Sequence, residues 1–522
     1  MTVETDITAR KLSVMNPATG ALLRELECAE ASHVRDAALR ARNAQAAWQA
    51  TPVRNRLTIV SRFQKLLNDR KTQVARTITS EAGKPVAEAL LTEVLVVLDA
   101  ARFLLQESYG FLRDEPVPHG SMATRAKKGR LVRQPYGVAG IISPWNYPFS
   151  IPAAQVLAAL VTGNAVVLKP SELTPLSALE IESLLRDAGL PENIFQVVIG
   201  DGRTGAALVE SGVDKLVFTG SVPTGKRIAE MAGARLLPVV LELGGKDPMI
   251  VLDDAGVDVA SSGAVWGAFV NAGQTCLSVE RCYVQRRIYD TFVLACVEKA
   301  RRLRVGNGME PGVEIGPLIH QRQLRVVEEH VADALARGAR LLTGGERLIS
   351  LGPNFYAPTV LADVNHEMRI MREETFGPLL PITAFDSEEE AVRLANDSEY
   401  GLAASVWTRD RNRGEGIARQ IRAGTVMIND AVSCFGISEA PHGGVKASGI
   451  GRTHGRFGLE EMVWLKYVDS DLLPGTKKPW WYGYGAGLAS AVEGFLDFQF
   501  ARGILRRLRG AARSSGMLSR KL

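Results

Sequence analysis

Cysteine and histidine are scarce in this chain, and their spacing excludes two kinds of site. The 522 residues include five cysteines and seven histidines. An odd number of cysteines without framework spacing predicts reduced thiols rather than disulfides, as in a cytoplasmic protein. No Cys/His cluster has the spacing of metal ligands, so we expect no metal site. The five cysteines are Cys28, Cys276, Cys282, Cys296 and Cys434.

Long apolar stretches are also missing. The chain has no run of 18 apolar residues, which predicts that no simple helix crosses a membrane. Residues 1–12 are polar and lack the apolar core of a signal peptide, so we expect a cytoplasmic protein. The apolar content of 46% over 522 residues still provides for more than one domain with a large core.

Positive charge is concentrated near the C-terminus. The formal net charge of the chain is +5. Residues 477–522 contain nine basic and two acidic residues, a net charge of +7, which leaves the rest of the chain at −2. The basic character therefore belongs to a tail, which we place at residues 471–522.

This tail combines aromatic, apolar and basic residues. Residues 480–484 contain two tryptophans and two tyrosines, and residues 488–509 are predicted to form one helix. A basic amphipathic helix after aromatic residues is typical of contact with an anionic membrane surface. Packing on a neighbouring subunit explains the pattern equally well. One side of the helix would carry Phe500, Ile504, Leu505 and Leu508, and the other Arg502, Arg506, Arg509 and Arg513.

Short apolar strands alternate with helices after residue 137, which predicts an α/β fold. Apolar strands of four to six residues separated by helices are typical of a doubly wound parallel sheet with both faces covered. A second alternating region runs from residue 249 to about 429, and residues 122–134 are predicted to form a hairpin. The predicted strands are 137–142, 165–168, 195–199, 215–218, 238–243, 281–285 and 425–428; the predicted helices are 153–160 and 177–188.

Two short motifs carry residues for covalent chemistry. Residues 241–246 (LELGGK) put the carboxylate of Glu242 beside two glycines, and residues 271–276 (NAGQTC) put the thiol of Cys276 after a Gly-Gln pair. A thiol nucleophile and a carboxylate that takes a proton from water can form and then hydrolyse a thioester. The leucines beside Glu242 would desolvate it and make it a stronger base. Backbone dipoles of a turn or helix start would stabilise a thiolate at Cys276.

Together with residues 144–148 (PWNYP) and 374–378 (ETFGP), these motifs resemble the aldehyde dehydrogenase superfamily over residues 15–470. The resemblance implies oxidation of an aldehyde to a carboxylic acid with NAD(P), through a cysteine thiohemiacetal and thioester, in a homodimer or homotetramer without nucleic acid. It implies a Rossmann-like NAD-binding domain, an α/β catalytic domain and a small β oligomerisation extension. These correspond to residues 12–117 with 137–243, residues 244–449, and residues 118–136 with 450–470.

The resemblance also implies where the pyrophosphate of the cofactor binds. The pattern G-x-G-x-x-G at residues 200–205 is weak evidence by itself. We expect the pyrophosphate at the later helix start that contains Gly220, Ser221 and Gly225, because small residues let backbone N–H groups approach a phosphate there. Gly202 and Gly205 would then lie near the adenosine.

Other residues are expected around the rest of the cofactor. Lys169 and Glu172 would bind the adenosine ribose. A carboxylate repels a 2′-phosphate, so Glu172 favours NAD, with NADP as an alternative cofactor. Glu374 would bond the nicotinamide ribose, and Phe376 would pack near the ring. The remaining expected contacts are Ile142, Ser143, Pro144, Trp145 and Leu243.

The family assigns the catalytic roles to three residues. Cys276 would attack the carbonyl carbon, and the side-chain amide of Asn146 would join the Cys276 backbone N–H in an oxyanion hole. Glu242 would deprotonate the water that hydrolyses the thioester. Such a general base favours release of a free acid over transfer to coenzyme A, which stays the alternative product.

The expected substrate tunnel is almost entirely apolar, which predicts an aliphatic or aromatic aldehyde. Residues 271–276 and 278–283 also resemble succinate-semialdehyde dehydrogenases, in which case Arg281 would bind the second carboxylate of the substrate. The expected tunnel residues are Tyr147, Phe149, Trp266, Phe269, Val270, Leu277 and Phe435.

Overall fold

The computed structural model describes residues 10–478 and 480–518. Residues 1–9, most of the polar segment considered above, lie outside this range. Among the described residues, no helix is both long and apolar enough to cross a membrane. Two units can be distinguished, one formed by residues 1–113 and 133–465, the other by residues 114–132 and 466–522.

The first unit contains a six-stranded sheet whose strand order is β17-β9-β8-β5-β6-β7. All neighbouring pairs from β9 to β7 are parallel, and only β17 is antiparallel. The predicted strands in this region are therefore confirmed. The strands are β5 (Val138–Ile142), β6 (Ala165–Lys169), β7 (Phe195–Val197), β8 (Lys215–Thr219), β9 (Val239–Glu242) and β17 (Gly449–Ile450).

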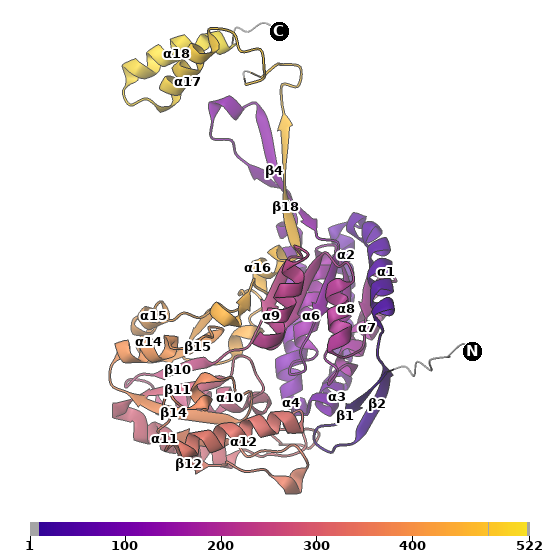
Figure 1. Cartoon of the computed structure of the whole chain (residues 1–522), viewed down its shortest axis with the longest axis vertical. Coiled ribbons are helices and arrows are strands. Elements are labelled where there is room, and N and C mark those ends of the chain that lie inside the picture. The colour runs from indigo at the N-terminus through magenta and orange to yellow at the C-terminus, as the bar shows by residue number, and fades with distance from the viewer. Residues whose placement is uncertain (1–9, 479, 519–522) are drawn as a thin grey trace, which may run out of the picture. The chain divides into compact units, whose positions relative to one another are not determined.

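Helices cover both faces of this sheet (Figure 1). Alternate residues of a strand point to opposite faces. Thus Ala139 and Ile141 of β5 belong to one apolar core, whereas Val138 and Ile142 belong to another. The helices include α1 (Ala31–Ala50), α2 (Val53–Asp69), α3 (Lys71–Ala82), α5 (Leu95–Phe111), α6 (Ser150–Val161), α7 (Leu176–Asp187), α8 (Gly202–Glu210), α9 (Val222–Gly233) and α16 (Gly455–Glu460).

The same unit contains a seven-stranded sheet of order β12-β13-β14-β11-β10-β15-β16, with β12 alone antiparallel to its neighbour. The predicted strands at residues 281–285 and 425–428 lie in it. Its strands are β10 (Asp247–Val251), β11 (Val279–Gln285), β12 (Arg340–Thr343), β13 (Thr359–Ala362), β14 (Leu379–Phe385), β15 (Ala403–Trp407) and β16 (Thr425–Ile428). Helices α10 (Val257–Phe269), α11 (Tyr289–Arg302), α12 (Gln321–Ala336), α14 (Glu388–Asn396) and α15 (Arg411–Ala418) accompany it.

A three-stranded antiparallel sheet contains the predicted hairpin. β3 (Glu115–Val117) pairs with β4 (Lys127–Pro135), and β18 (Val463–Asp471) lies on the other side of β4. β18 is thus an edge strand.

The tail folds as a helical hairpin, so the predicted single helix over residues 488–509 is wrong. The structure has α17 (Leu488–Phe500) and α18 (Ile504–Leu518). The chain turns at Gly503, whose φ of +101° is a conformation that glycine adopts without strain. Close packing also needs glycine, because a Cβ on Gly494 would lie 2.8 Å from the carbonyl oxygen of Gly510.

Candidate active site

The site lies at the carboxyl ends of the parallel strands of the six-stranded sheet. Ile142 pairs with Lys169 on one side and with Phe218 on the other, while Thr219 pairs with Glu242. The chain leaves β5 for β6 on one side and later returns to β8 on the other. The crevice beyond such a switch point is where doubly wound sheets bind ligands.

Cys276 follows a strained loop. Asn271, Ala272 and Gly273 have φ values of 54°, 55° and 73°, all in the left-handed region. No larger residue fits in place of Gly273, because a Cβ there would lie 2.1 Å from the carbonyl oxygen of Gly377. Cys276 is the one partly exposed cysteine, whereas the other four are buried. Strain of this kind is typical of functional sites.

The pKa of the Cys276 thiol is raised well above its usual value. Burial is the main cause, and the nearby carboxylates of Asp247, Glu242 and Glu374 add to it. The expected stabilisation of a thiolate by backbone dipoles is therefore outweighed. A thiolate forms here only when a proton acceptor or a positive charge lies beside the sulfur.

Asn146 is a fixed polar group close to this loop. Its side chain is 4% exposed and donates from Nδ2 to the Gln274 carbonyl oxygen at 3.0 Å. The Asn146 carbonyl accepts from Lys84 Nζ at 2.8 Å and from Asn271 Nδ2 at 2.9 Å. A primary amide has two N–H groups, so one remains for a ligand.

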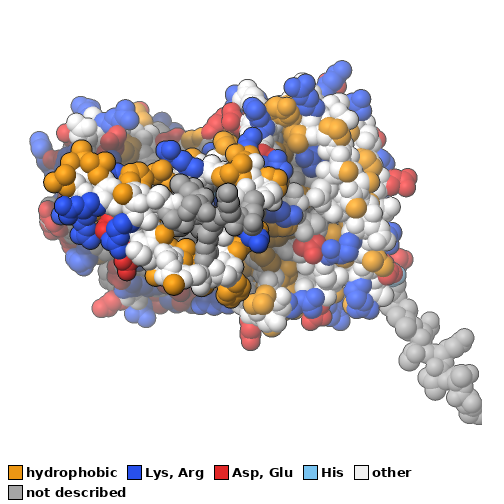
Figure 2. Space-filling view, turned by 90° about the horizontal axis from the view of Figure 1, so that it is seen from above, with side chains coloured by type: hydrophobic (Ala, Val, Ile, Leu, Met, Phe, Trp, Pro, Cys, Tyr) orange, Lys and Arg blue, Asp and Glu red, His pale blue; other side chains and the backbone are white. Residues whose placement is uncertain are grey.

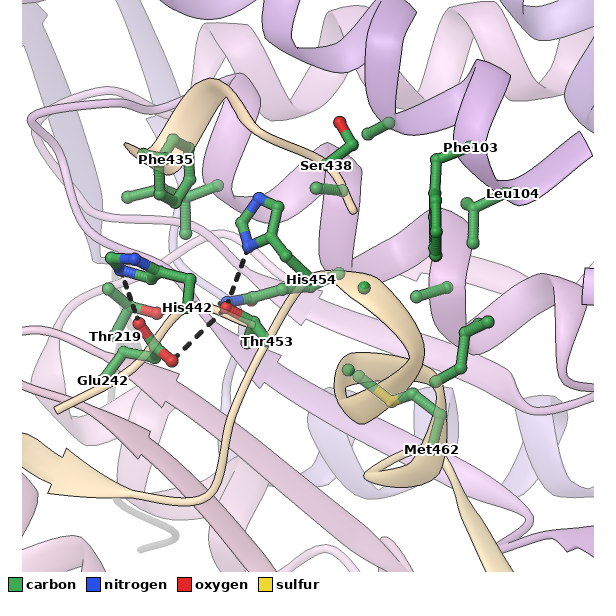
Figure 3. A pocket seen from close by; sticks show the side chains of 18 of the residues that line it. Phe103, Leu104, Thr219, Glu242, Phe435, Ser438, His442, Thr453, His454 and Met462 are labelled. Carbon is green, nitrogen blue, oxygen red and sulfur yellow. Dashed lines mark hydrogen bonds and ion pairs between the residues drawn. The ribbon is translucent and has the colours of Figure 1, made fainter. Parts of the chain in front are cut away.

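Glu242 ends β9 and is 6% exposed. His442 Nε2 lies 3.1 Å from one carboxylate oxygen, and Thr453 Oγ1 donates to the other at 3.3 Å (Figure 3). Sequence reasoning missed both partners, which are about 200 residues away along the chain.

Two cavities meet at the catalytic candidates. A larger one, of about 1260 Å³ including space open to solvent, is lined by Asn146, Glu242 and Cys276. A second, of about 720 Å³, is lined by Glu242 and Cys276 as well. We call them the cofactor groove and the inner cavity. A thiol and a carboxylate shared by both can act on a substrate that bridges them.

Seven of the residues expected around the cofactor line the cofactor groove. They are Pro144, Trp145, Gly220, Ser221, Leu243, Glu374 and Phe376. The ring of Trp145 contacts that of Phe376 edge-on at 5.4 Å. Ile142 and Ser143 lie directly before this wall, at the end of β5.

The two candidate phosphate sites differ in structure. At the start of α8, the Asp201 carboxylate caps the helix by accepting from Arg203 N, and Arg10 also binds it. A side-chain carboxylate therefore already occupies the helix start beside Gly202 and Gly205. At the start of α9, the neutral Ser221 is the N-cap and faces the groove. The start of α9 fits a pyrophosphate better.

Packing keeps the start of α9 close to the sheet. A Cβ on Gly225 would lie 2.5 Å from the side chain of Leu243, and one on Gly220 would lie 2.6 Å from the ring of Phe218. Glycine at both positions permits this approach.

Ion pairs and hydrogen bonds fix other residues that are expected to contact the cofactor. Lys169 Nζ lies 3.1 Å from Glu172 Oε2. Gly245 N donates to Glu374 at 3.0 Å, and burial raises the pKa of Glu374 to about 8. The neighbouring Phe376 N donates to the buried Glu280 at 2.9 Å. Glu280, which sequence reasoning missed, thus fixes the turn that carries Glu374.

The walls of the inner cavity differ from those expected. Only Phe435 of the expected tunnel residues lines it. Phe149 and Phe269 are buried in apolar cores, Leu277 lines a small separate cavity, and Tyr147 donates to or accepts from Thr275 Oγ1 at 2.8 Å. Trp266 is 45% exposed and Val270 lies in the core. The apolar walls come mainly from α5, α6 and α16: Ala100, Phe103, Leu104, Ile151, Ala154, Ala158, Leu459 and Met462.

The position expected for a second substrate carboxylate is not supported. Arg281 is 1% exposed, and its guanidinium donates to the carbonyl oxygens of Lys246, Leu394 and Ala395 at 2.8–3.0 Å. These bonds tie β11 to its neighbours. No Lys or Arg lines the inner cavity among the described residues.

The start of α12 supplies groove residues that sequence reasoning also missed. His320, Arg322, Gln323 and Val326 line the cofactor groove. They lie some 45 residues beyond Cys276, with no motif to mark them. Only the folding of α12 against the groove reveals them.

Comparisons with known proteins agree with this geometry. The model of the aldehyde dehydrogenase family matches residues 4–468. The chain is 40% identical over 494 residues to a 4,4'-diapolycopene aldehyde oxidase of Methylomonas sp, which covers 93% of this chain and 91% of that protein. It is 37% identical over 462 residues to a mitochondrial succinate-semialdehyde dehydrogenase of Oryza sativa subsp. japonica, covering 88% and 86%.

A solved NAD+ complex of an aldehyde dehydrogenase from Bacillus cereus is similar in structure. Its TM-score is 0.85 at 35% identity, covering 89% of this chain and 94% of that one. The chain therefore belongs to the aldehyde dehydrogenase family and is an NAD(P)-dependent enzyme that oxidises an aldehyde to a carboxylic acid.

Proposed function

We propose that Cys276 is the nucleophile and Asn146 the oxyanion donor of this enzyme. The sulfur attacks the aldehyde carbon to give a thiohemiacetal. The oxygen of this intermediate accepts hydrogen bonds from the free Asn146 side-chain N–H and from the backbone N–H of Cys276. Oxidised nicotinamide, when bound, would supply the acceptor for the hydride that the thiohemiacetal carbon loses as it becomes a thioester. The observation that carries the proposal is that Cys276, Glu242 and Asn146 meet in one groove.

Glu242 is the general base for the second half of the reaction. Its carboxylate takes a proton from water, and the resulting hydroxide attacks the thioester carbon on Cys276. The carbon–sulfur bond then breaks and the acid leaves. This assignment favours hydrolysis over transfer to coenzyme A.

The proposed cofactor is NAD, with its nicotinamide end in the cofactor groove and its adenosine beyond the residues that line the groove. The pyrophosphate lies at Gly220 and Ser221, the nicotinamide ribose at Glu374, and the adenosine ribose at Lys169 and Glu172. Because the carboxylate of Glu172 repels a 2′-phosphate, NAD is preferred and NADP is the weaker cofactor. Gly202 and Gly205 keep their proposed place beside the adenosine.

The substrate is an apolar aldehyde with a long chain. Alkyl and aromatic side chains line much of the inner cavity, alongside polar ones that include Glu242 and His442. Transfer of an alkyl chain from water to apolar surroundings gains about 0.8 kcal/mol per CH₂. A relative at 40% identity carries the name 4,4'-diapolycopene aldehyde oxidase. Succinate semialdehyde, suggested by other relatives, is the alternative.

A series of straight-chain aldehydes tests the substrate. We expect kcat/KM to rise with chain length, by roughly two- to fourfold per CH₂ until the cavity is filled. The variant Ala154→Leu narrows the cavity. It should lower kcat/KM for long-chain aldehydes by about tenfold and that for propanal much less. A kcat/KM that is highest for succinate semialdehyde would refute the proposal in favour of the alternative.

The enzyme is a homodimer or homotetramer that assembles through the small sheet. β18 lies at the edge of its sheet, and Trp464, Leu465 and Tyr467 on it are 40–57% exposed. Edge strands with exposed apolar residues pair readily with another copy of the same chain.

The helical hairpin of the tail contacts an anionic membrane surface. Phe500, Ile504, Leu505 and Leu508, at and after the turn, are 62–75% exposed. Arg502 and Arg509 lie beside them. Figure 2 shows apolar side chains in orange next to basic ones in blue on the face that it presents. Such a surface binds lipid through apolar insertion and attraction to acidic headgroups, and it suits an enzyme for lipid-soluble aldehydes.

Sedimentation with phosphatidylglycerol vesicles tests this contact. The full chain should sediment with the vesicles, less so with phosphatidylcholine or at high salt, whereas a chain ending at residue 478 should stay in solution. The triple variant Phe500→Ser, Ile504→Ser, Leu505→Ser changes only exposed residues and should behave like the truncated chain. Equal partitioning of all three proteins contradicts membrane contact and leaves the neighbouring subunit as the partner.

A further inference from the structure

Two side chains hold the Glu242 carboxylate, and they belong to one bonded pair of segments. His442 and Thr453 lie opposite each other on an antiparallel bridge, in which each backbone N–H donates to the other's carbonyl oxygen at 2.7 Å. His442 Nε2 and Thr453 Oγ1 reach different oxygens of Glu242. All three side chains are at least 93% buried. The carboxylate is therefore fixed from two sides.

The segment also leaves room for this arrangement. Gly443 has a φ of +148°, and a Cβ there would lie 3.2 Å from Glu242 Oε1. β17, a few residues later, pairs Gly449 with Glu242 itself. Residues 442–453 thus contact Glu242 through both their backbone and their side chains.

Few other charged groups face His442. Phe435 packs edge-on against the imidazole, with ring centroids 5.1 Å apart, and His454 lies at 5.8 Å. Burial and the neighbouring His442 lower the pKa of His454 to about 3, so His454 is neutral. The Arg452 guanidinium donates to the carbonyl oxygens of Gly444 and Gly451.

His442 is a cation at neutral pH. Burial by itself would lower its pKa, but the Glu242 carboxylate and the Cys434 sulfur together raise the pKa of His442 to about 10. The imidazolium therefore persists up to about pH 10 and is lost above it. Figure 3 shows His442 next to Glu242, with Phe435 on its other side.

We propose that His442 is a positioning residue that holds the carboxylate of the general base in place. This inference rests on the proposed role of Glu242. In the step concerned, Glu242 takes a proton from water, the water oxygen bonds to the thioester carbon, and the electron pair of the broken carbon–sulfur bond stays on Cys276. The proton of His442 remains on its ring throughout.

A burst of reduced cofactor separates a positioning role from a general structural one. His442→Phe removes the donor that holds the Glu242 carboxylate, so hydrolysis of the thioester should slow while its formation continues. We expect kcat at pH 7 to fall by about tenfold or more, with a stopped-flow burst of reduced cofactor close to one per active site. His442→Gln keeps a neutral donor and should regain much of kcat.

A histidine elsewhere serves as the matched control. His366 bonds Asp397 and Tyr283 and lines neither cavity, so His366→Gln should leave kcat unchanged. If the two His442 variants lose kcat equally, or if the burst is lost together with kcat, His442 is only structural and the proposal is overturned. If Glu242→Gln itself turns over at the wild-type rate, the proposed function fails instead.

Discussion

Replacing Cys276 by alanine is expected to lower kcat by roughly 10⁴-fold or more, because no other nucleophile is positioned to form the thioester. The remaining cysteines cannot substitute for it, since all four are buried. The side chain of Cys276 borders two cavities, so its truncation removes little packing. NAD binding, followed by quenching of tryptophan fluorescence, should therefore be close to that of the wild type.

Cys28→Ala is the matched control for this experiment. Cys28 is 9% exposed and lies near the N-terminal strands, away from both cavities. Its activity should be unchanged. Substantial turnover by Cys276→Ala, with the wild-type pattern of products, would show that the reaction does not proceed through this sulfur.

Replacing Glu242 by glutamine is expected to stop the second half of the reaction and spare the first. The amide has nearly the shape of the carboxylate, but it accepts hydrogen bonds only at its oxygen and cannot take a proton from water. Steady-state turnover should fall by about 10²- to 10⁴-fold. Stopped-flow absorbance should still show a burst of reduced cofactor, with an amplitude close to one per active site.

The burst distinguishes the roles of the two residues. If the variant loses both the burst and the turnover, Glu242 acts in a step before the thioester forms, for instance as the base that activates Cys276. A variant with wild-type turnover would remove Glu242 from the mechanism.

Much of the fold was predictable from the sequence because its signals are local. The buried strands of the parallel sheet are short apolar runs, as β5 and β6 show. Cys276, Glu242 and Asn146 lie in compact motifs, and the structure brings these three together in one groove. Their catalytic roles remain proposals that the experiments above test.

Other features depend on contacts that no local pattern encodes. His442 contacts Glu242 from a bridge with Thr453, in a segment whose strand β17 pairs with β9. The walls of the inner cavity come from helices that lie outside the motifs in sequence. The sequence neighbours of Cys276 and Asn146 therefore did not predict which residues line this cavity. Arg281 looked available as a substrate ligand, but backbone carbonyls use its guanidinium. The raised pKa of Cys276 likewise arises from burial and, to a smaller extent, from nearby carboxylates, both of which depend on the fold.

The helical hairpin of the tail was not predicted from the sequence for a different reason. The pattern of apolar and basic residues over 488–509 is compatible with one continuous helix, and glycine is tolerated within helices at a cost of about 1 kcal/mol. Packing of α17 on α18 through Gly494 and Gly510 favours the turn at Gly503 instead. The helix break therefore reflects tertiary contacts more than local propensity.

Mass spectrometry of the trapped enzyme tests the central claim most directly. The Glu242→Gln variant is mixed with NAD and a long-chain aldehyde, quenched in acid and digested. We expect one acyl group per chain, attached as a thioester to the peptide that contains Cys276. Absence of an acyl group during an observed burst, or its attachment to any other residue, would contradict the account.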